Sequence, residues 1–285
     1  KVLEKGGPEE KEYRQLDEIF QVLSEDLRKG LLNPEEIELF HKSLFGEGME
    51  DSLHGHCQLK PYGYAGDFMI IDKMYRQQVT DNPRFRKWDM FWNNHAAVKA
   101  VRNRKDYFIH TLRAHLQSKR PLRLLNVASG PARDLSELYA QINPASLQTT
   151  CIEADSHAIG YARELTKEYE EQVNFVHKNV FRYQDTAQYD VVWSAGLFDY
   201  FEDKLFIKLL KKLVSWAAPG GEVIVGNFNT HNPSRQYMEL IGDWYLHHRS
   251  AEELTELAIQ AGIDRERIHV GSEPEAINLF LHIRV

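Results

Sequence analysis

The sequence contains little cysteine. Its 285 residues include two cysteines, Cys57 and Cys151, which lie far apart along the chain. This spacing excludes a disulfide framework and a zinc motif of paired cysteines, and it fits a reducing compartment such as the cytoplasm. His54, His56 and Cys57 lie close together in sequence, but a structural zinc ion needs about four ligands. Because no second group of ligands follows in the sequence, we expect no metal site. From the low cysteine content, we expect a cytoplasmic protein.

Long apolar runs and blocks of positive charge are also missing. No stretch is long enough to span a membrane, and no signal peptide opens the chain, so we expect no stable membrane insertion. The formal net charge is -7, with 35 Lys and Arg against 42 Asp and Glu, which argues against nucleic acid as a partner. There is no internal repeat. The chain begins with Lys1 rather than Met, which leaves an upstream segment open.

The residues before position 120 have the apolar spacing of helices. This spacing predicts helices over about residues 9–29, 67–78 and 93–117, and another that begins at Asn33-Pro34. A long loop is expected over residues 46–63. We predict a helical region over residues 1–119.

After residue 120, short apolar segments alternate with helical patterns. This alternation is typical of a parallel sheet with helices on both faces, so we predict an α/β domain over residues 120–285. The last two apolar segments, RIHVG and INLFLHIRV, are joined by Ser-Glu-Pro-Glu-Ala without a helix. Two strands joined so tightly are expected to pair antiparallel.

The first strand leads into a turn of small residues. The stretch LRLLNVASGPARDL, residues 122–135, predicts a buried strand, a turn around Gly130 and a helix. Small side chains let a ligand approach the backbone closely. A tight strand-to-helix turn also occurs in α/β proteins that bind nothing there.

Polar and small residues follow the other strands where each one ends. Open α/β sheets bind ligands at the carboxyl ends of their strands. Glu153 ends the second strand, where a carboxylate can accept hydrogen bonds from both hydroxyls of a ribose. Its alternative is an acid at a helix start, beside Asp155 as the cap. The residues that we assign to a cofactor here are Ala128, Ser129, Gly130, Asp134, Glu153, Ala154, Asn179, Val180, Ser194, Ala195 and Gly196.

The chemical class of the cofactor follows from what the turn lacks. A dinucleotide fingerprint needs the three glycines of G-x-G-x-x-G to hold a pyrophosphate, and this turn contains Gly130 alone. A nucleoside without phosphates does not require a turn with three glycines. S-adenosylmethionine is such a ligand.

Residues 122–285 resemble the class I S-adenosylmethionine-dependent methyltransferases. NVASGPARD stands where that family has a glycine-rich D-x-G-x-G-x-G turn, with Asn126 in place of the Asp and with Ala128 and Ala132 in place of two glycines. Glu153, YDVVWSAG, AAPGGEVIVGNF and the terminal strand pair extend the resemblance. It implies a Rossmann-like sheet, S-adenosylmethionine as the cofactor and methyl transfer as the activity.

Three separated stretches are similar to a narrower family. KPYGYAGD, AAVKAVRNRKDYF and NPSRQYMELIGDWYLHHRS look like segments of bacterial methyltransferases of 3-hydroxypalmitic acid methyl ester synthesis. That family makes a quorum-sensing fatty acid ester. The resemblance implies a hydroxy fatty acid as the methyl acceptor.

Two groups before the first strand are candidates for the cofactor. Pro61 and Gly63 stiffen and turn the KPYGYAGD loop, and Tyr64 is placed to donate to the methionyl carboxylate as part of a lid. The alternative is a structural turn with packed tyrosines. Arg102 and Arg104 need anionic partners; the cofactor carboxylate is a candidate for Arg102, whereas Arg104 fits a solvated helix cation equally well.

The remaining candidates follow the fourth and fifth strands, where acceptor and cofactor are expected to meet. We assign catalytic roles to His231, Arg235 and Tyr200, and substrate binding to Phe198, Asn229, Tyr237, Trp244 and Arg249. Cations that orient a carboxylate are present without an evident base and nucleophile pair, which favours carboxyl O-methylation of a small-molecule acid. Core packing explains Phe198 equally well, and residues 234–246 are alternatively a surface helix.

Three further possibilities stay open. The acceptor is alternatively another small molecule or a peptide carboxylate, or the chain is a non-catalytic sensor that binds S-adenosylmethionine. A homodimer, if one forms, is expected to pair through the N-terminal helices.

Overall fold

A computed structural model describes residues 2–44, 46, 48–116 and 120–285. The chain divides into two compact units. The first comprises Lys1–Lys99 with Asn232–Tyr245, and the second comprises Ala100–His231 with Leu246–Val285. The predicted domain boundary at residues 119 and 120 stays a prediction. None of the helices in the described part is long and apolar enough to cross a membrane.

The first unit is helical. Its helices are α1 (Tyr13–Arg28), α2 (Pro34–Leu44), α3 (Leu53–Leu59), α4 (Phe68–Tyr75), α5 (Arg86–Asn94), α10 (Arg235–Gly242) and the start of α6 (Ala96–His115), with 3-10 turns η1 (Leu3–Lys5), η2 (Glu10–Glu12) and η3 (Met49–Asp51). The expected loop over residues 46–63 is wrong, because it contains α3. The Ser52 side chain begins that helix by accepting a hydrogen bond from the Gly55 amide at 2.9 Å. Helix α5 was not predicted.

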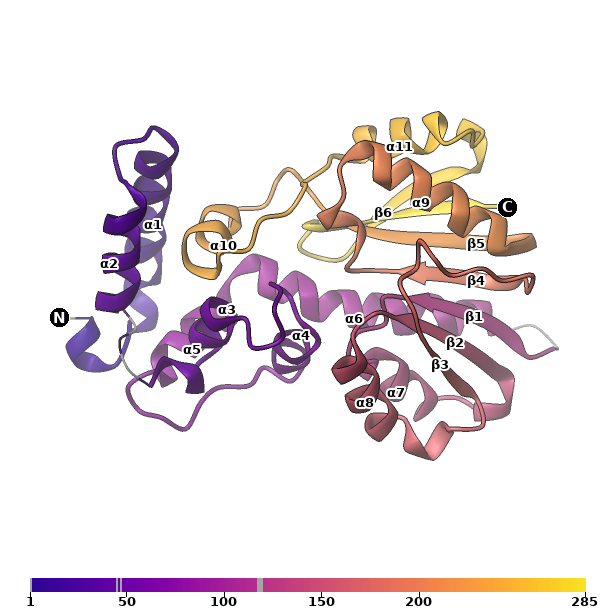
Figure 1. The fold of residues 1–285 in the computed structure, drawn as a ribbon, viewed down its shortest axis with the longest axis horizontal. Helices are drawn as coiled ribbons and strands as arrows, with labels where there is room; N and C mark the ends of the chain where they lie inside the picture. The colour runs from indigo at the N-terminus through magenta and orange to yellow at the C-terminus, as the bar shows by residue number, and fades with distance from the viewer. Residues whose placement is uncertain (1, 45, 47, 117–119) are drawn as a thin grey trace. The chain divides into compact units, whose positions relative to one another are not determined.

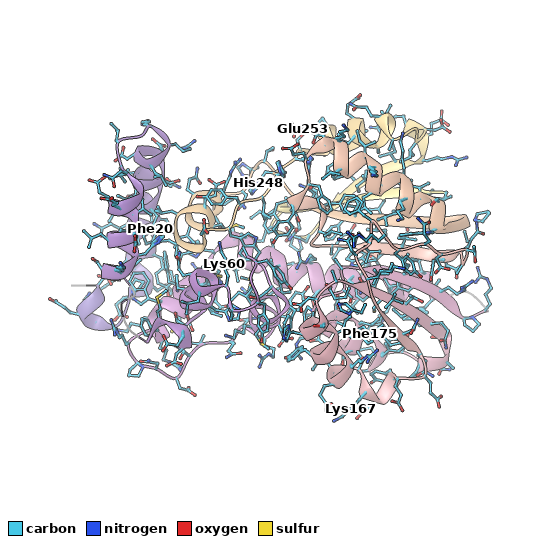
Figure 2. All side chains as sticks on the ribbon, viewed as in Figure 1. Phe20, Lys60, Lys167, Phe175, His248 and Glu253 are labelled. Carbon is cyan, nitrogen blue, oxygen red and sulfur yellow. The ribbon has the colours of Figure 1, made fainter. Side chains whose placement is uncertain are left out.

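Aromatic side chains form the core of the first unit. Phe20 (labelled in Figure 2), Trp88, Phe91, Trp92 and Tyr237 are each at most 5% exposed. Helix α10 packs against α1 and α3, which places the segment after the fifth strand in this helical unit. Fully burying each large apolar side chain contributes about 1.5–3 kcal/mol, so these rings hold short helices that would be marginal alone.

The second unit is built on one seven-stranded sheet in the order β3-β2-β1-β4-β5-β7-β6. Its strands are β1 (Leu122–Val127), β2 (Leu147–Glu153), β3 (Val173–His177), β4 (Tyr189–Ser194), β5 (Ala217–Phe228), β6 (Ile268–Ser272) and β7 (Asn278–Arg284). The first five strands pair parallel, and β7 pairs antiparallel with both β5 and β6. The predicted α/β sheet, mostly parallel with an antiparallel last strand, is confirmed.

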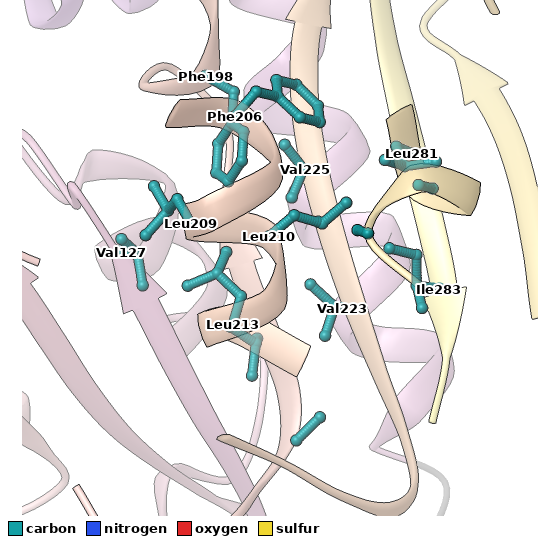
Figure 3. Close-up of a cluster of buried hydrophobic side chains, with 14 of the residues drawn as sticks. Val127, Phe198, Phe206, Leu209, Leu210, Leu213, Val223, Val225, Leu281 and Ile283 are labelled. Carbon is teal, nitrogen blue, oxygen red and sulfur yellow. The ribbon is translucent and has the colours of Figure 1, made fainter. Parts of the chain in front are cut away.

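Helices cover both faces of this sheet (Figure 1). Helix α6, α7 (Arg133–Tyr139) and α8 (Ser156–Leu165) bury side chains such as Phe108 and Leu135 on one face. Helices α9 (Asp203–Trp216) and α11 (Ala251–Gln260) cover the other face, where Leu209, Leu213 and Val223 belong to one cluster of buried side chains (Figure 3). The remaining 3-10 turns are η4 (Pro144–Ser146), η5 (Lys167–Tyr169), η6 (Phe198–Tyr200) and η7 (Arg265–Arg267).

Candidate cofactor and acceptor site

The turn after β1 has a left-handed backbone at every second residue. Ala128, Gly130 and Ala132 have φ values of 54°, 54° and 53°. The left-handed conformation costs a residue with a Cβ atom about 1–2 kcal/mol, so Ala128 and Ala132 hold strained backbone there. Such strain persists where the surrounding structure fixes it, often at ligand sites. The backbone of the turn therefore adopts the left-handed conformation that glycine favours, although two of its three left-handed residues are alanine.

Open space faces this turn at Gly130. A Cβ atom built on Gly130 would have no other atom within 4 Å. A ligand can therefore approach the backbone at this position. This observation fits the predicted cofactor cradle.

The Glu153 carboxylate connects the ends of β1 and β2. Its Oε2 accepts a hydrogen bond from the Gly130 amide at 2.9 Å, and its Oε1 accepts from the amides of Ala154 and Asp155 at 2.7 and 3.0 Å. A carboxylate has about four acceptor positions, so capacity remains for a ribose hydroxyl. The Asp155 side chain accepts from the His157 amide at 2.8 Å and caps α8, which confirms the cap assigned to it.

A buried arginine lies at the same edge of the sheet. Arg104, from α6, is 6% exposed and donates to the Ala195 carbonyl at 3.2 Å. Burial raises the pKa of the Asp134 carboxyl to about 6, and the charge of Arg104 opposes that rise. A Cβ atom on Gly196 would lie 3.2 Å from Arg104 Nη1. The structure thus brings together Arg104 and the predicted residues Asp134, Ala195 and Gly196.

The sequence analysis assigned Arg102 rather than Arg104 to the cofactor, and that assignment stays a prediction. Arg102 is half-buried, and burial lowers its pKa. Ala100, Arg104 and Phe108 are each at most 6% exposed and follow the i, i+4, i+8 spacing of one helix face. That spacing was the available signal for a buried Arg104.

Two buried polar atoms at this edge have no hydrogen-bond partner within the described residues. They are Asn126 Nδ2 in β1 and Ser194 Oγ at the end of β4. Unsatisfied buried polar atoms are costly, at about 1–3 kcal/mol each. Of the other predicted cofactor residues in this unit, Ala154 and Asn179 are exposed and Val180 is buried. Tyr64 belongs to the first unit and is 40% exposed; its role as a lid stays a prediction.

The guanidinium of Arg249 is fully engaged by protein groups. Its five N–H groups donate to Asp203 Oδ1 (twice), Asn227 Oδ1 and the carbonyls of Phe198 and Phe201. All five donors of an arginine are thereby used. The sequence assigned Arg249 to substrate binding, but the structure gives it no remaining N–H for a substrate carboxylate.

The other residues on the acceptor side fall in both units. In the second unit, Tyr200 is 39% exposed, Phe198 is fully buried, and the side chain of Asn229 donates to the Ala276 carbonyl at 2.9 Å. His231 is exposed. Arg235, Tyr237 and Trp244 belong to the first unit. Arg235 Nε donates a hydrogen bond to Glu239 at 2.7 Å. Tyr237 and Trp244 are buried, and the Tyr237 ring stacks on His95 while its hydroxyl hydrogen-bonds His54. Their assignments stay predictions.

The histidines near Cys57 have partners in the protein. His56 Nε2 bonds both oxygens of Asp67, at 3.0 and 2.9 Å, and the same carboxylate caps α4. Cys57 is buried. Across the described ranges, no group of three or more His, Cys, Asp or Glu is arranged to hold a metal ion.

Comparisons with known proteins concern the domain and its fold. Residues 124–221 match the family model described as a methyltransferase domain, which identifies this segment as an enzyme domain. A search of curated proteins by sequence finds no match.

Three solved structures illustrate the fold. A protein described as a possible exported protein from Bordetella parapertussis has a TM-score of 0.64 at 17% identity, covering 76% of this chain and 79% of its own. The S-adenosylmethionine-dependent methyltransferase SibL has 0.53 at 15%, covering 91% and 76%. Magnesium protoporphyrin IX methyltransferase from Synechocystis, with bound S-adenosylhomocysteine, has 0.52 at 16%, covering 66% and 87%. At these identities the likeness concerns the fold.

Proposed function

We propose that this chain, which carries a methyltransferase domain over residues 124–221, transfers a methyl group from S-adenosylmethionine to the carboxylate of an apolar small-molecule acid such as a hydroxy fatty acid. The single observation that supports cofactor binding best is the open left-handed turn at Gly130, tied to Glu153 by a hydrogen bond. The Gly130 backbone, the Glu153 carboxylate and the buried Arg104 of the second unit would each contact part of the cofactor.

The backbone around Gly130 would approach the cofactor closely, and Glu153 would accept from a ribose hydroxyl with its remaining acceptor position. Arg104 is the buried cation that would face the methionyl carboxylate. Asp134, whose pKa burial raises to about 6, stands within the field of Arg104 and would balance its charge. When bound, the cofactor supplies an electrophilic methyl group on a sulfonium.

The acceptor side supports a carboxylate. Carboxyl groups of ordinary acids ionise well below pH 6, so the acceptor needs orientation rather than a general base. His231 and Tyr200 are the exposed polar groups that follow β5 and β4, and they would hydrogen-bond the acceptor. Arg235 stays a candidate for holding its charge. A flat dependence of the rate on pH between about 6 and 8 is expected for this class of acceptor.

The test is transfer of labelled methyl to products. Cell extracts and 3-hydroxyhexadecanoic acid are incubated with methyl-labelled S-adenosylmethionine and the full chain, and products are identified by mass spectrometry. A labelled methyl ester supports the proposal. Label on nitrogen, carbon or a phenol refutes the carboxylate. Cofactor binding without any labelled product favours the non-catalytic sensor, and absence of cofactor binding refutes both.

The predicted homodimer has support on the first unit. Ile19 and Val22 on α1 and Leu39 on α2 are 45, 58 and 65% exposed, and exposed apolar groups favour association. Light scattering of the full chain should give a dimer that Val22→Glu weakens; a monomer at high concentration refutes it. A cytoplasmic location likewise stays part of the proposal.

A further inference from the structure

A buried arginine joins the loop after β4 to the end of β5. We infer that Arg249 is a positioning residue, which holds the η6 turn and its Tyr200 in place for the methyl acceptor. The inference rests on the proposed function, because it assigns a role in the same reaction. It replaces direct substrate binding by Arg249.

The guanidinium reaches both ends of the loop. Nη1 donates to the Phe198 carbonyl at 3.4 Å, and Nη2 donates to the Phe201 carbonyl at 2.5 Å, so the two residues that flank Asp199 and Tyr200 are bound to one group. Nη1 also donates to Asn227 Oδ1 at 2.9 Å, near the end of β5. One planar group therefore fixes the loop to the sheet.

A second set of hydrogen bonds fastens the same loop from Asp199. The Phe228 amide donates to Asp199 Oδ1, and the His247 amide donates to the Asp199 carbonyl at 2.7 Å. The Arg249 amide in turn donates to the Phe228 carbonyl at 2.8 Å. The loop, the end of β5 and the segment around His247 thus form one hydrogen-bonded assembly.

The surroundings of Arg249 explain why an arginine is required. The side chain is 5% exposed, and its guanidinium lies over the Phe206 ring at 4.8 Å. Asp203 accepts from Nε at 3.1 Å and from Nη2 at 2.9 Å, which pairs the buried charge. A lysine has three donors on a single atom and cannot reach carbonyls on both sides of the loop while it pairs with Asp203.

The loop that Arg249 fixes is the one that the proposed reaction uses. Tyr200 is 39% exposed and lies in η6, the turn that follows the end of β4 at Ser194. Methyl transfer is an in-line displacement, whose rate depends on how well the reacting groups are aligned. Arg249 acts on that alignment through the backbone of η6, without an N–H left for the acceptor itself.

The experiment compares Arg249→Lys and Asp203→Ala with a matched control, Arg267→Lys. The side chain of Asp203 is 68% exposed. We therefore expect the Asp203→Ala variant to fold even if the Arg249→Lys variant does not. The side chain of Arg267 is 57% exposed, and its Nε lies 3.8 Å from Asp264 Oδ2 in an ion pair that does not involve Arg249. Each full-length variant is tested for S-adenosylhomocysteine affinity by calorimetry, for methyl transfer to the acid identified with the wild-type chain, and for amide hydrogen exchange.

The expected results separate positioning from simple stability. Arg249→Lys should lower kcat by about tenfold or more, since small misplacements have large effects on rate, while the affinity for S-adenosylhomocysteine stays within about twofold. Exchange at the Phe228 and His247 amides should accelerate because local opening becomes easier. Asp203→Ala should show a smaller change of the same kind, and Arg267→Lys none.

Two results would overturn the inference. One is an unchanged kcat in a folded Arg249→Lys variant, and the other is a parallel loss of cofactor affinity and kcat. If the wild-type chain methylates no acid, the proposed function fails instead. The exchange data then decide about Arg249 alone, because unchanged protection at Phe228 and His247 shows that it does not hold the loop.

Discussion

A pair of substitutions in the β1 turn tests whether its left-handed backbone serves the cofactor. Gly130→Ala adds a methyl group and Ala128→Gly removes one at residues that share a φ of 54°. The left-handed conformation destabilises the folded state by about 1–2 kcal/mol for a residue with a Cβ atom. A glycine avoids that cost but lowers the free energy of unfolding by about 0.5–1 kcal/mol, because it gives the unfolded chain more conformational entropy. Ala128→Gly should therefore raise the free energy of unfolding by about 0.5–1 kcal/mol, and Gly130→Ala should lower it by a similar amount.

The two substitutions should differ in cofactor binding. The Cβ atom of Gly130→Ala would meet no protein atom within 4 Å, so it fills space that the protein leaves open. If the cofactor occupies that space, the affinity for S-adenosylhomocysteine should fall by about tenfold or more, which corresponds to about 1.4 kcal/mol. Ala128→Gly should leave the affinity nearly unchanged. Gly130→Val should also destabilise the fold, because a β-branched residue strongly disfavours the positive φ at this position.

Urea denaturation gives the stability of both variants, and calorimetry gives their affinity for S-adenosylhomocysteine. Equal affinity of Gly130→Ala and the wild-type chain would show that the cofactor does not approach this turn. A loss of stability in Ala128→Gly larger than about 1 kcal/mol would contradict the left-handed backbone at Ala128.

Three other predictions concern ionisation. Burial raises the pKa of the Cys57 and Cys151 thiols, so iodoacetamide at pH 8 should alkylate neither in the folded chain and both in urea. Burial raises the pKa of Asp134 from 3.8 to about 6. The stability that the protonated carboxyl provides is present below pH 3.8 and is lost as the pH rises through 6. Asp134→Asn should therefore stabilise the chain at pH 7 by about 3 kcal/mol, and a destabilised variant would contradict this. Burial would also raise the pKa of Glu222, but hydrogen bonds from His115 and His282 lower it to about 2; stability should fall as the pH drops from 4.5 toward 2, and an equal fall in Glu222→Gln would refute that assignment.

The alternation of strands and helices could be predicted because the strands of the sheet are short segments that are rich in apolar and β-branched residues. LRLLNV, TTCIE and DVVWS carry that signal without any long-range information. Helices α3 and α5 carry none of comparable strength, since they have 7 and 9 residues and contain Gly55, Asn93 and Asn94. Their stability comes from aromatic packing inside the first unit, which local propensity does not encode. The grouping of residues 232–245 with that unit is a tertiary fact of the same kind.

The candidate site divides along the same line. Gly130 and Glu153 could be proposed from the sequence because their positions at strand ends are a property of the chain order, and a hydrogen bond of 2.9 Å connects them in the structure. The roles of the arginines depend instead on which donors the fold already uses. Arg235 and Arg249 look alike in the sequence, as cations after the fifth strand. Arg235 is 46% exposed and Arg249 is 5% exposed in their side chains, because Arg249 follows a segment that pairs with the end of β5. Binding of the acceptor carboxylate therefore has to be sought among cations whose N–H groups are not all used by the protein. The same criterion changes the proposed role of Arg249 from binding the acceptor to holding the loop that contains Tyr200.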